Sequence, residues 1–138
     1  MTADIKKLID ELSELDYENL FGDDFFHTWD KSQDELKAIW KTADILRAMR
    51  EENISPKIFD SGLGISLFRD NSTRTRFSFA SACNLLGLEV QDLDEGKSQI
   101  AHGETVKETA NMISFMADVV GIRDDMYIGK GYKYMKDF

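Results

Sequence analysis

Hydrophobic residues recur at helical spacing in two stretches of the first 56 positions. The first stretch lies near the N-terminus and predicts an amphipathic helix. The second follows Ser32-Gln33-Asp34-Glu35, a capping box that starts a helix, and runs as one apolar stripe to about Glu51. Asn53 and Pro56 then stop it. The apolar positions are Ile5, Leu8, Ile9, Leu12 and Leu15 in the first stretch, and Leu36, Ile39, Trp40, Ala43, Leu46 and Met49 in the second.

Residues 17–29 interrupt this pattern with Gly22, paired aspartates and clustered aromatic residues. We expect a loop whose rings pack on the domain. The sequence therefore suggests a division into residues 1–30, an N-terminal helix with an aromatic loop, and residues 31–138, the main domain.

Beyond Pro56 the hydrophobic pattern changes to short strands separated by helices. Residues 65–68 are mostly apolar without strict alternation, which is typical of a central parallel strand covered on both faces. A helix over about 73–86, burying Phe79, Ala82, Cys83 and Leu86, ends before Gly87. A strand over 88–93, a helix from Glu104 or Thr105, and a strand over 118–122 ending at Arg123 follow. This order predicts an α/β fold, a three-layer domain with a central parallel sheet flanked by helices. Residues 129–138 do not complete an obvious element, so the chain looks like part of a longer one.

Composition narrows the classes of function. The chain has 138 residues and a formal net charge of -9, which argues against a nucleic-acid partner, because binding a phosphate backbone requires a basic face. The one cysteine, Cys83, cannot form an internal disulfide, and we interpret it as a core residue. The sequence shows no run long enough to cross a membrane and no signal-type N-terminus, which favours a cytoplasmic location.

The stretch 64–79 carries the clearest chemistry. A short strand, a polar turn and the start of a helix place free backbone N–H groups at Ser72-Thr73-Arg74-Thr75-Arg76. Cations in a first helical turn oppose the helix dipole, so Arg74 and Arg76 indicate an external anion. Because residues two apart on a helix diverge, we assign Arg74 to the ligand and Arg76 mainly to a salt bridge. The alternative is an ordinary Ser N-cap followed by solvated arginines.

Two other polar segments follow strands, namely Ser98 to His102 and Arg123. In a parallel sheet the carboxyl ends of the strands share one edge, where ligands bind. These segments should therefore lie near the helix that begins after Ser72. Arg123 by itself is more typical of a solvated strand-end arginine paired with Asp124 or Asp125.

Ser72-Thr73-Arg74-Thr75-Arg76 resembles the carbamoyl-phosphate-binding signature of the aspartate and ornithine carbamoyltransferase superfamily. The segment Ser98-Gln99-Ile100-Ala101-His102-Gly103-Glu104-Thr105 resembles its second loop and is closer to the ornithine-type pattern, since the aspartate type has lysine where His102 stands. The residues around both motifs are most similar to the knotted YgeW-type carbamoyltransferases. The resemblance extends from about Trp29 to the end of the chain.

The resemblance implies a role for each matching residue. Ser72, Thr73, Arg74 and Thr75 would bind the phosphate, Thr75 would also face the carbonyl oxygen, and Arg123 would bridge phosphate and carbonyl. Arg74, Thr75 and Arg123 are thus the expected catalytic residues. Gln99 and His102 would lie on a loop that reaches the active site of a neighbouring subunit in a homotrimer. The resemblance implies no metal and no cofactor.

The family also has a second domain, which binds the amine acceptor and carries a His-Pro-x-x-Gln motif, and neither is found in this sequence. We expect the chain to be the carbamoyl phosphate half of a carbamoyltransferase that acts on an unidentified amine, and to be inactive alone. The alternative is a non-catalytic module that binds phosphate or an acyl phosphate for regulation or assembly. A nucleotide-binding domain is disfavoured, because no glycine-rich phosphate loop occurs.

Overall fold

The computed structural model describes residues 2–138 and divides the chain into two compact units between Pro56 and Lys57. The first unit contains two helices and two short 3-10 turns. Its elements are α1 (Ala3–Ser13), η1 (Glu18–Leu20), η2 (Thr28–Asp30) and α2 (Gln33–Glu51). The predicted boundary at residue 30 falls inside this unit. The division into residues 1–30 and 31–138 stays a prediction.

The capping box of α2 forms as predicted. The Glu35 amide donates to the Ser32 hydroxyl at 3.1 Å, and the Ser32 amide donates to the Glu35 carboxylate at 2.5 Å. The predicted apolar stripe is wrong in phase, however. Ala38 and Ile45 are buried, whereas Trp40 exposes 72% of its surface. Packing of α1 against α2 selects the buried side of α2, and local spacing could not show where α1 would lie.

The aromatic loop also differs from the expectation. Phe21 exposes 96% of its surface and Trp29 is also exposed, so neither ring is buried in the first unit. Trp29 instead stacks on His27, with 4.2 Å between ring centroids. The loop is held within its own unit by the ion pair of Lys31 with Asp23.

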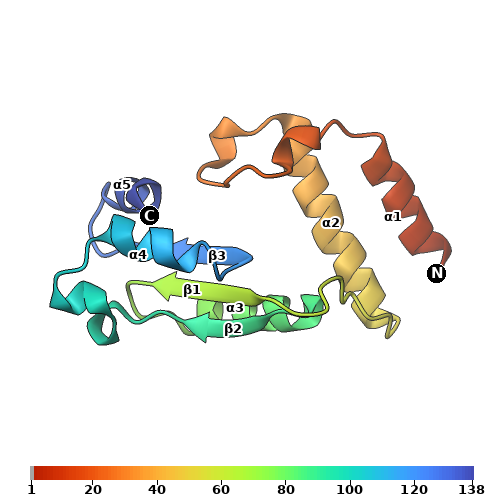
Figure 1. Cartoon of the computed structure of the whole chain (residues 1–138). Helices are drawn as coiled ribbons and strands as arrows, with labels where there is room; N and C mark the ends of the chain where they lie inside the picture. Colours follow the sequence, from red (N-terminus) through yellow and green to blue (C-terminus); the bar gives the residue numbers. More distant parts are fainter. Residues whose placement is uncertain (1) are drawn as a thin grey trace. The chain divides into compact units, whose positions relative to one another are not determined.

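The second unit is an α/β domain built on three parallel strands in the order β2-β1-β3. Figure 1 shows α3 behind the strands and α4 in front of β3, so helices flank the sheet as predicted. Its elements are β1 (Leu63–Phe68), α3 (Thr73–Leu86), β2 (Glu89–Asp92), η3 (Glu95–Lys97), η4 (Gln99–His102), α4 (Val106–Ile113), β3 (Val119–Arg123) and α5 (Gly131–Asp137).

The central strand β1 forms the core of this unit. Its residues from Gly64 to Phe68 are all buried, and Leu67 is completely inaccessible. Helix α3 packs against it through Cys83, and the Phe79 ring meets the Phe68 ring edge-on, with 6.0 Å between centroids. Ala82 is exposed, contrary to the prediction that it would be buried. The burial of β1 on both faces is what the mostly apolar run without alternation predicted.

Gly121 in β3 and Gly87 after α3 are glycines for identifiable reasons. A Cβ at Gly121 would lie 2.6 Å from Cε2 of Phe79, so the strand and helix approach too closely for a side chain. Gly87 has φ of 102° and caps α3 in the left-handed conformation. Both glycines help to fix the position of α3 on the sheet.

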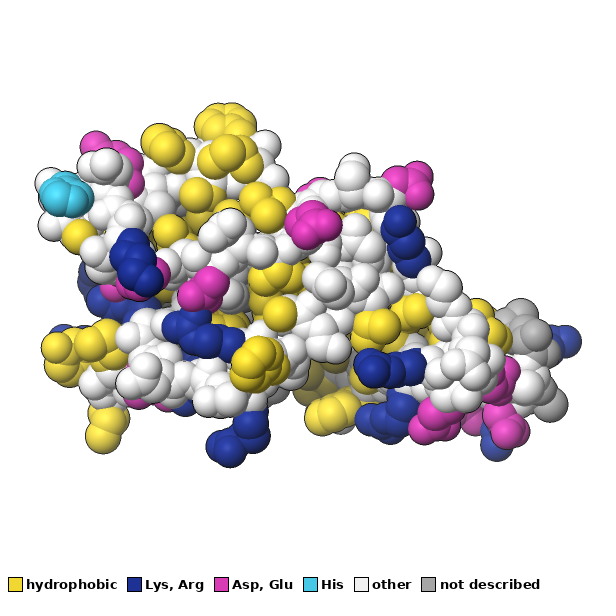
Figure 2. Space-filling model, turned by 90° about the horizontal axis from the view of Figure 1, so that it is seen from below, with side chains coloured by type: hydrophobic (Ala, Val, Ile, Leu, Met, Phe, Trp, Pro, Cys, Tyr) yellow, Lys and Arg dark blue, Asp and Glu magenta, His cyan; other side chains and the backbone are white. Residues whose placement is uncertain are grey.

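The last helix, α5, was not predicted from the sequence. Its one buried residue is Tyr134, whose hydroxyl donates to Glu95. On the face drawn in Figure 2, basic side chains are scattered among acidic and hydrophobic ones. None of the described helices combines the length and hydrophobicity that crossing a membrane requires.

Candidate functional site

The end of β1 leads through a short turn into α3, and this junction holds the predicted anion site. Asp70 closes the turn by accepting a 2.7 Å hydrogen bond from the Asn71 amide. Ser72 is the N-cap residue of α3, in an extended conformation, but its hydroxyl makes no capping hydrogen bond. The first turn of α3 contains no acidic side chain that could complement the helix dipole. The N-terminus of α3 is therefore positively polarised.

The four residues assigned to phosphate make no side-chain hydrogen bond or ion pair within the part of the chain that the structure describes. They are Ser72, Thr73, Arg74 and Thr75. Thr73 and Arg74 are exposed, and Ser72 and Thr75 are partly exposed. Their hydroxyl and guanidinium donors are thus available to a ligand.

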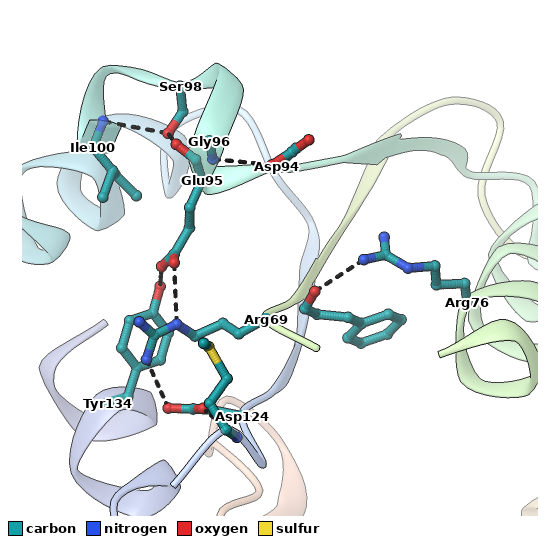
Figure 3. A network of polar contacts seen from close by, with 11 residues as sticks. Arg69, Arg76, Asp94, Glu95, Gly96, Ser98, Ile100, Asp124 and Tyr134 are labelled. Carbon is teal, nitrogen blue, oxygen red and sulfur yellow. Dashed lines mark hydrogen bonds and ion pairs between the residues drawn. The ribbon is translucent and has the colours of Figure 1, made fainter. Parts of the chain in front are cut away.

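Arg76 forms a salt bridge, as we predicted. Its guanidinium pairs with Asp92 at the end of β2 and donates at 2.9 Å to the carbonyl of Phe68. It also lies 5.6 Å from the centroid of the Phe68 ring. Figure 3 shows the bond to the Phe68 carbonyl. Arg76 therefore ties the start of α3 to the ends of β1 and β2.

Arg123 is placed at the same edge of the sheet by strand register. It pairs with Phe68 across the β1–β3 ladder, and the Arg69 amide donates to its carbonyl at 3.0 Å. Its guanidinium forms an ion pair with Asp125. The pairing that the sequence offered as an alternative thus exists, so a ligand that uses Arg123 must compete with Asp125.

The loop that carries Gln99 and His102 follows β2, and Figure 1 places it at the same end of the sheet. Ser98 shapes this loop: its hydroxyl donates to the Glu95 carbonyl at 3.0 Å and accepts from the Ile100 amide at 3.3 Å. The side chains of Gln99 and His102 are exposed, and within residues 2–138 neither is hydrogen-bonded to the N-terminus of α3 or to Arg123.

A polar network beside this site joins Arg69, Glu95, Asp124 and Tyr134 (Figure 3). Asp124, which the sequence offered as a partner of Arg123, binds Arg69 instead. Arg69 donates through Nε to Glu95 at 3.1 Å and through a terminal nitrogen to Asp124 at 2.8 Å. Its guanidinium carbon lies 4.1 Å from the ring centroid of Tyr134, which donates to Glu95. No sequence signal identified these contacts, because the partners of Arg69 lie 26 and 55 positions away.

The network shifts the pKa values of two of its members. Burial works against the charge of Arg69, but its hydrogen bonds with Asp124 and Glu95 outweigh that effect and raise the pKa of the guanidinium. Burial raises the pKa of Tyr134 well above its usual value, and the hydrogen bond to the Glu95 carboxylate adds to the shift. Arg69 therefore stays charged and Tyr134 stays a neutral donor.

A cavity of about 460 Å³ lies against this network rather than at the N-terminus of α3. Its wall includes Lys130, Lys133 and Tyr127 together with Arg69, Asp124 and Tyr134. Lys133 is paired with Asp137, so the charges around the cavity are mixed. Among the described residues, no three His, Cys, Asp or Glu side chains gather as a metal centre requires.

Comparison with known proteins identifies the family. Residues 23–137 match the family model described as the carbamoyl-phosphate-binding domain of aspartate/ornithine carbamoyltransferase. The chain is 62% identical, over 99% of its own length, to the YgeW protein of Escherichia coli strain K12, whose name assigns it provisionally to the carbamoyltransferases. It covers 34% of that relative, about a third of its length.

Solved structures share the fold. An ornithine carbamoyltransferase from Pyrococcus furiosus superposes with a TM-score of 0.75 at 27% identity, over 86% of this chain and 36% of that one. Aspartate transcarbamoylase from Trypanosoma cruzi, in complex with carbamoyl phosphate, superposes with a TM-score of 0.76 at 21% identity, over 88% and 36% of the two chains. The chain belongs to the aspartate/ornithine carbamoyltransferase family and corresponds to its carbamoyl-phosphate-binding domain.

Proposed function

We propose that this chain is the half of a carbamoyltransferase that binds carbamoyl phosphate, and that the complete enzyme transfers the carbamoyl group to an amine. The observation that carries the proposal is the pairing of two features at one edge of the sheet. The N-terminus of α3 offers Arg74, whose side chain has no hydrogen bond or ion pair among residues 2–138, and Arg123 ends strand β3, which lies next to β1. The T. cruzi structure with carbamoyl phosphate supports the choice of ligand, since it has this fold.

Each residue has a defined task in this proposal. The α3 N–H groups, the hydroxyls of Ser72 and Thr73, and the guanidinium of Arg74 bind the phosphate. Thr75 donates to the carbonyl oxygen, and Arg123 bridges that oxygen and the phosphate. The backbone of α3 and β3 sets where these donors start, so they can stabilise charge where it develops.

The reaction needs no covalent intermediate. The amine nitrogen attacks the carbamoyl carbon, the new C–N bond forms, and the bond from that carbon to the phosphate oxygen breaks. The electron pair leaves with the phosphate, and the departing phosphate takes up the proton that the amine nitrogen loses. Negative charge grows on the carbonyl oxygen and on the departing phosphate, which are the two positions that Thr75, Arg74 and Arg123 would face.

Calorimetric titration of the chain with fresh carbamoyl phosphate, and separately with inorganic phosphate, tests the binding half. We expect carbamoyl phosphate to bind more tightly, and Arg74→Ala to weaken it by about tenfold or more, since one charge-assisted contact is lost. Arg47→Ala is the matched control, because Arg47 is an exposed arginine on α2 that pairs only locally with Asp44. Unchanged binding by Arg74→Ala would contradict the site.

The acceptor requires the longer protein, because this chain spans about a third of its relatives. Phosphate release by the full-length protein with a panel of amines tests the transferase. Release with one amine would identify the acceptor class. Binding of carbamoyl phosphate without release for any amine would favour a non-catalytic phosphate-binding module instead.

We also propose a homotrimer in which the loop from Ser98 to His102 reaches a neighbouring subunit. Its exposed Gln99 and His102 side chains support this, since within the described chain they form no hydrogen bond or ion pair with the site. Light scattering on the full-length protein measures the assembly, and a monomer would exclude it. The expected cytoplasmic location likewise stays a prediction.

A further inference from the structure

Arg69 connects the three segments that carry the candidate site, which are the start of α3, the loop after β2 and the end of β3. Its own side chain is not among the groups assigned to the ligand. It is the first residue after β1, three positions before Ser72, the N-cap residue of α3. Its guanidinium reaches Glu95 at 3.1 Å in the loop after β2, and Asp124 at 2.8 Å in the loop after β3 (Figure 3). One planar group therefore crosses the sheet edge from the outer strand β2 to the outer strand β3.

The Glu95 end of this connection leads directly to the loop with Gln99 and His102. The Glu95 carboxylate accepts from both Arg69 and Tyr134. The Glu95 carbonyl accepts from the Ser98 amide at 3.2 Å and from the Ser98 hydroxyl at 3.0 Å. Because Ser98 begins the loop, fixing Glu95 fixes the point from which the loop projects.

The Asp124 end leads to Arg123. The Asp124 side chain is only 1% exposed, and Arg69 is its ion-pair partner among the described residues. A buried carboxylate without a partner is strongly unfavourable, so the position of Asp124 depends on Arg69. The Arg69 amide also binds the Arg123 carbonyl at 3.0 Å. Arg69 thus binds the carbonyl of Arg123 through its amide and the side chain of the next residue, Asp124, through its guanidinium.

We propose that Arg69 is a positioning residue that aligns Arg123 and the loop from Ser98 to His102 with the phosphate-binding start of α3. It acts through Asp124 and Glu95 and does not touch the ligand. This inference rests on the proposed function, because it concerns the same site. The forked guanidinium is essential to it, since two carboxylates in different loops must be bound at once.

Three variants of the chain separate positioning from a plain charge effect and from a plain stability effect. Arg69→Gln removes the charge and the fork, Arg69→Lys keeps the charge but not the fork, and Glu95→Gln weakens only the loop arm while leaving the buried pair with Asp124. Arg47→Gln is the control, because it removes one exposed arginine charge from the first unit. Each variant is titrated with carbamoyl phosphate below its melting temperature.

Amide hydrogen exchange over peptides covering 94–104 supplies a second readout that does not depend on ligand. We expect Arg69→Gln and Arg69→Lys each to lose roughly tenfold in affinity, as for one misaligned charge-assisted hydrogen bond, and to exchange faster in this segment. Glu95→Gln should exchange faster there without unfolding, so it keeps the test valid if the Arg69 variants do not fold. Arg47→Gln should match the wild type.

Each other result has a definite meaning. Full recovery of affinity by Arg69→Lys would show an electrostatic effect of the charge and would overturn the positioning role. A lower melting temperature with unchanged exchange at 94–104 and unchanged affinity would show a structural role only, and would also overturn it. Wild-type protein that binds no carbamoyl phosphate, but whose loop loosens in Glu95→Gln, would reject the proposed function while leaving the mechanical connection intact.

Discussion

The backbone amide of Arg69 donates a 3.0 Å hydrogen bond to the carbonyl of Arg123. This bond extends the ladder between β1 and β3 by one step beyond the pairing of Phe68 with Arg123. From that step the backbone that leaves β1 turns toward Ser72 and the start of α3, and the end of β3 carries the Arg123 side chain. Arg74 and Arg123 are the two arginines proposed to bind phosphate. The distance between them is therefore set by the register of the sheet and by the three-residue turn before Ser72.

Arg74 and Arg76 should separate binding from stability. Arg76→Gln removes the ion pair with Asp92 and the bond to the Phe68 carbonyl, so we expect the free energy of unfolding to fall by about 1–2 kcal/mol. Arg74→Gln breaks no contact among the described residues and should leave it within about 0.5 kcal/mol. Urea unfolding monitored by circular dichroism measures both variants.

The same two variants are then titrated with carbamoyl phosphate. Arg74→Gln should lose affinity, while Arg76→Gln should retain most of it at a temperature where it is folded. The reverse pattern, with Arg76→Gln folded normally and unable to bind, would mean that the assignment of the two arginines is inverted.

Asp125 should act as an internal competitor for Arg123. Its carboxylate occupies the guanidinium that we assign to the ligand. Because the pair is partly exposed and worth no more than about 1 kcal/mol, Asp125→Asn should tighten binding of carbamoyl phosphate by up to about fivefold. Calorimetric titration at constant ionic strength measures the change.

The control for this prediction is Asp44→Asn, which removes an equal charge paired with an arginine on α2 in the first unit. A general gain from lowering the negative charge of the chain would appear in both variants. If both tighten equally, or if Asp125→Asn binds no better than the wild type, then Arg123 does not exchange Asp125 for the ligand.

The parts of the fold that local chemistry specifies were predictable. Helix α3 spans Thr73–Leu86 as expected, because Gly87 in the left-handed conformation stops it. The capping box at Ser32 forms for the same kind of reason, since its two hydrogen bonds lie within one turn. The order of strands and helices in the second unit followed from the change in hydrophobic period.

The parts that depend on distant contacts were not predictable. Helix α5 has one buried residue, Tyr134, and that residue is held by Glu95 and Arg69 rather than by an apolar stripe. Helical geometry alone predicted that Arg74 and Arg76 point in different directions. The salt bridge predicted for Arg76 is present, with Asp92 as its partner. The partners of Arg69 could not be inferred, because a residue in a turn has no periodic neighbour that reveals its direction.

Cys83 should make stability depend on pH in the alkaline range. Burial raises the pKa of its thiol above the ordinary value of a cysteine. The folded state therefore keeps the proton at pH values where the unfolded chain releases it. The stability linked to this group is complete below about pH 8.5 and is lost as the pH rises toward the folded-state pKa. The free energy of unfolding should decrease over that range.

The measurement is urea unfolding from pH 7.5 to 10 for the wild type and for Cys83→Ala, which lacks the titrating thiol. Subtracting the two slopes removes the contribution of lysines and tyrosines. Equal slopes would show that the thiol titrates alike in both states. A thiol reagent gives an independent check, since buried Cys83 should react slowly until the protein unfolds.

Gly121 should tolerate no side chain because of Phe79. An added Cβ would lie 2.6 Å from Cε2 and 2.9 Å from Cδ2 of that ring, within the layer where α3 packs on the sheet. Gly121→Ala should therefore lower the free energy of unfolding by about 1–3 kcal/mol, as overpacking does. Phe79→Leu in the same chain removes the clashing ring edge, so the double variant should lose less than the sum of the two single losses, with an interaction energy of about 1 kcal/mol or more.

Urea unfolding of the four proteins gives this cycle. Simple additivity would mean that strand β3, rather than the ring, moves to make room, and carbamoyl phosphate titration of Gly121→Ala would then show a shifted Arg123 as a loss of affinity.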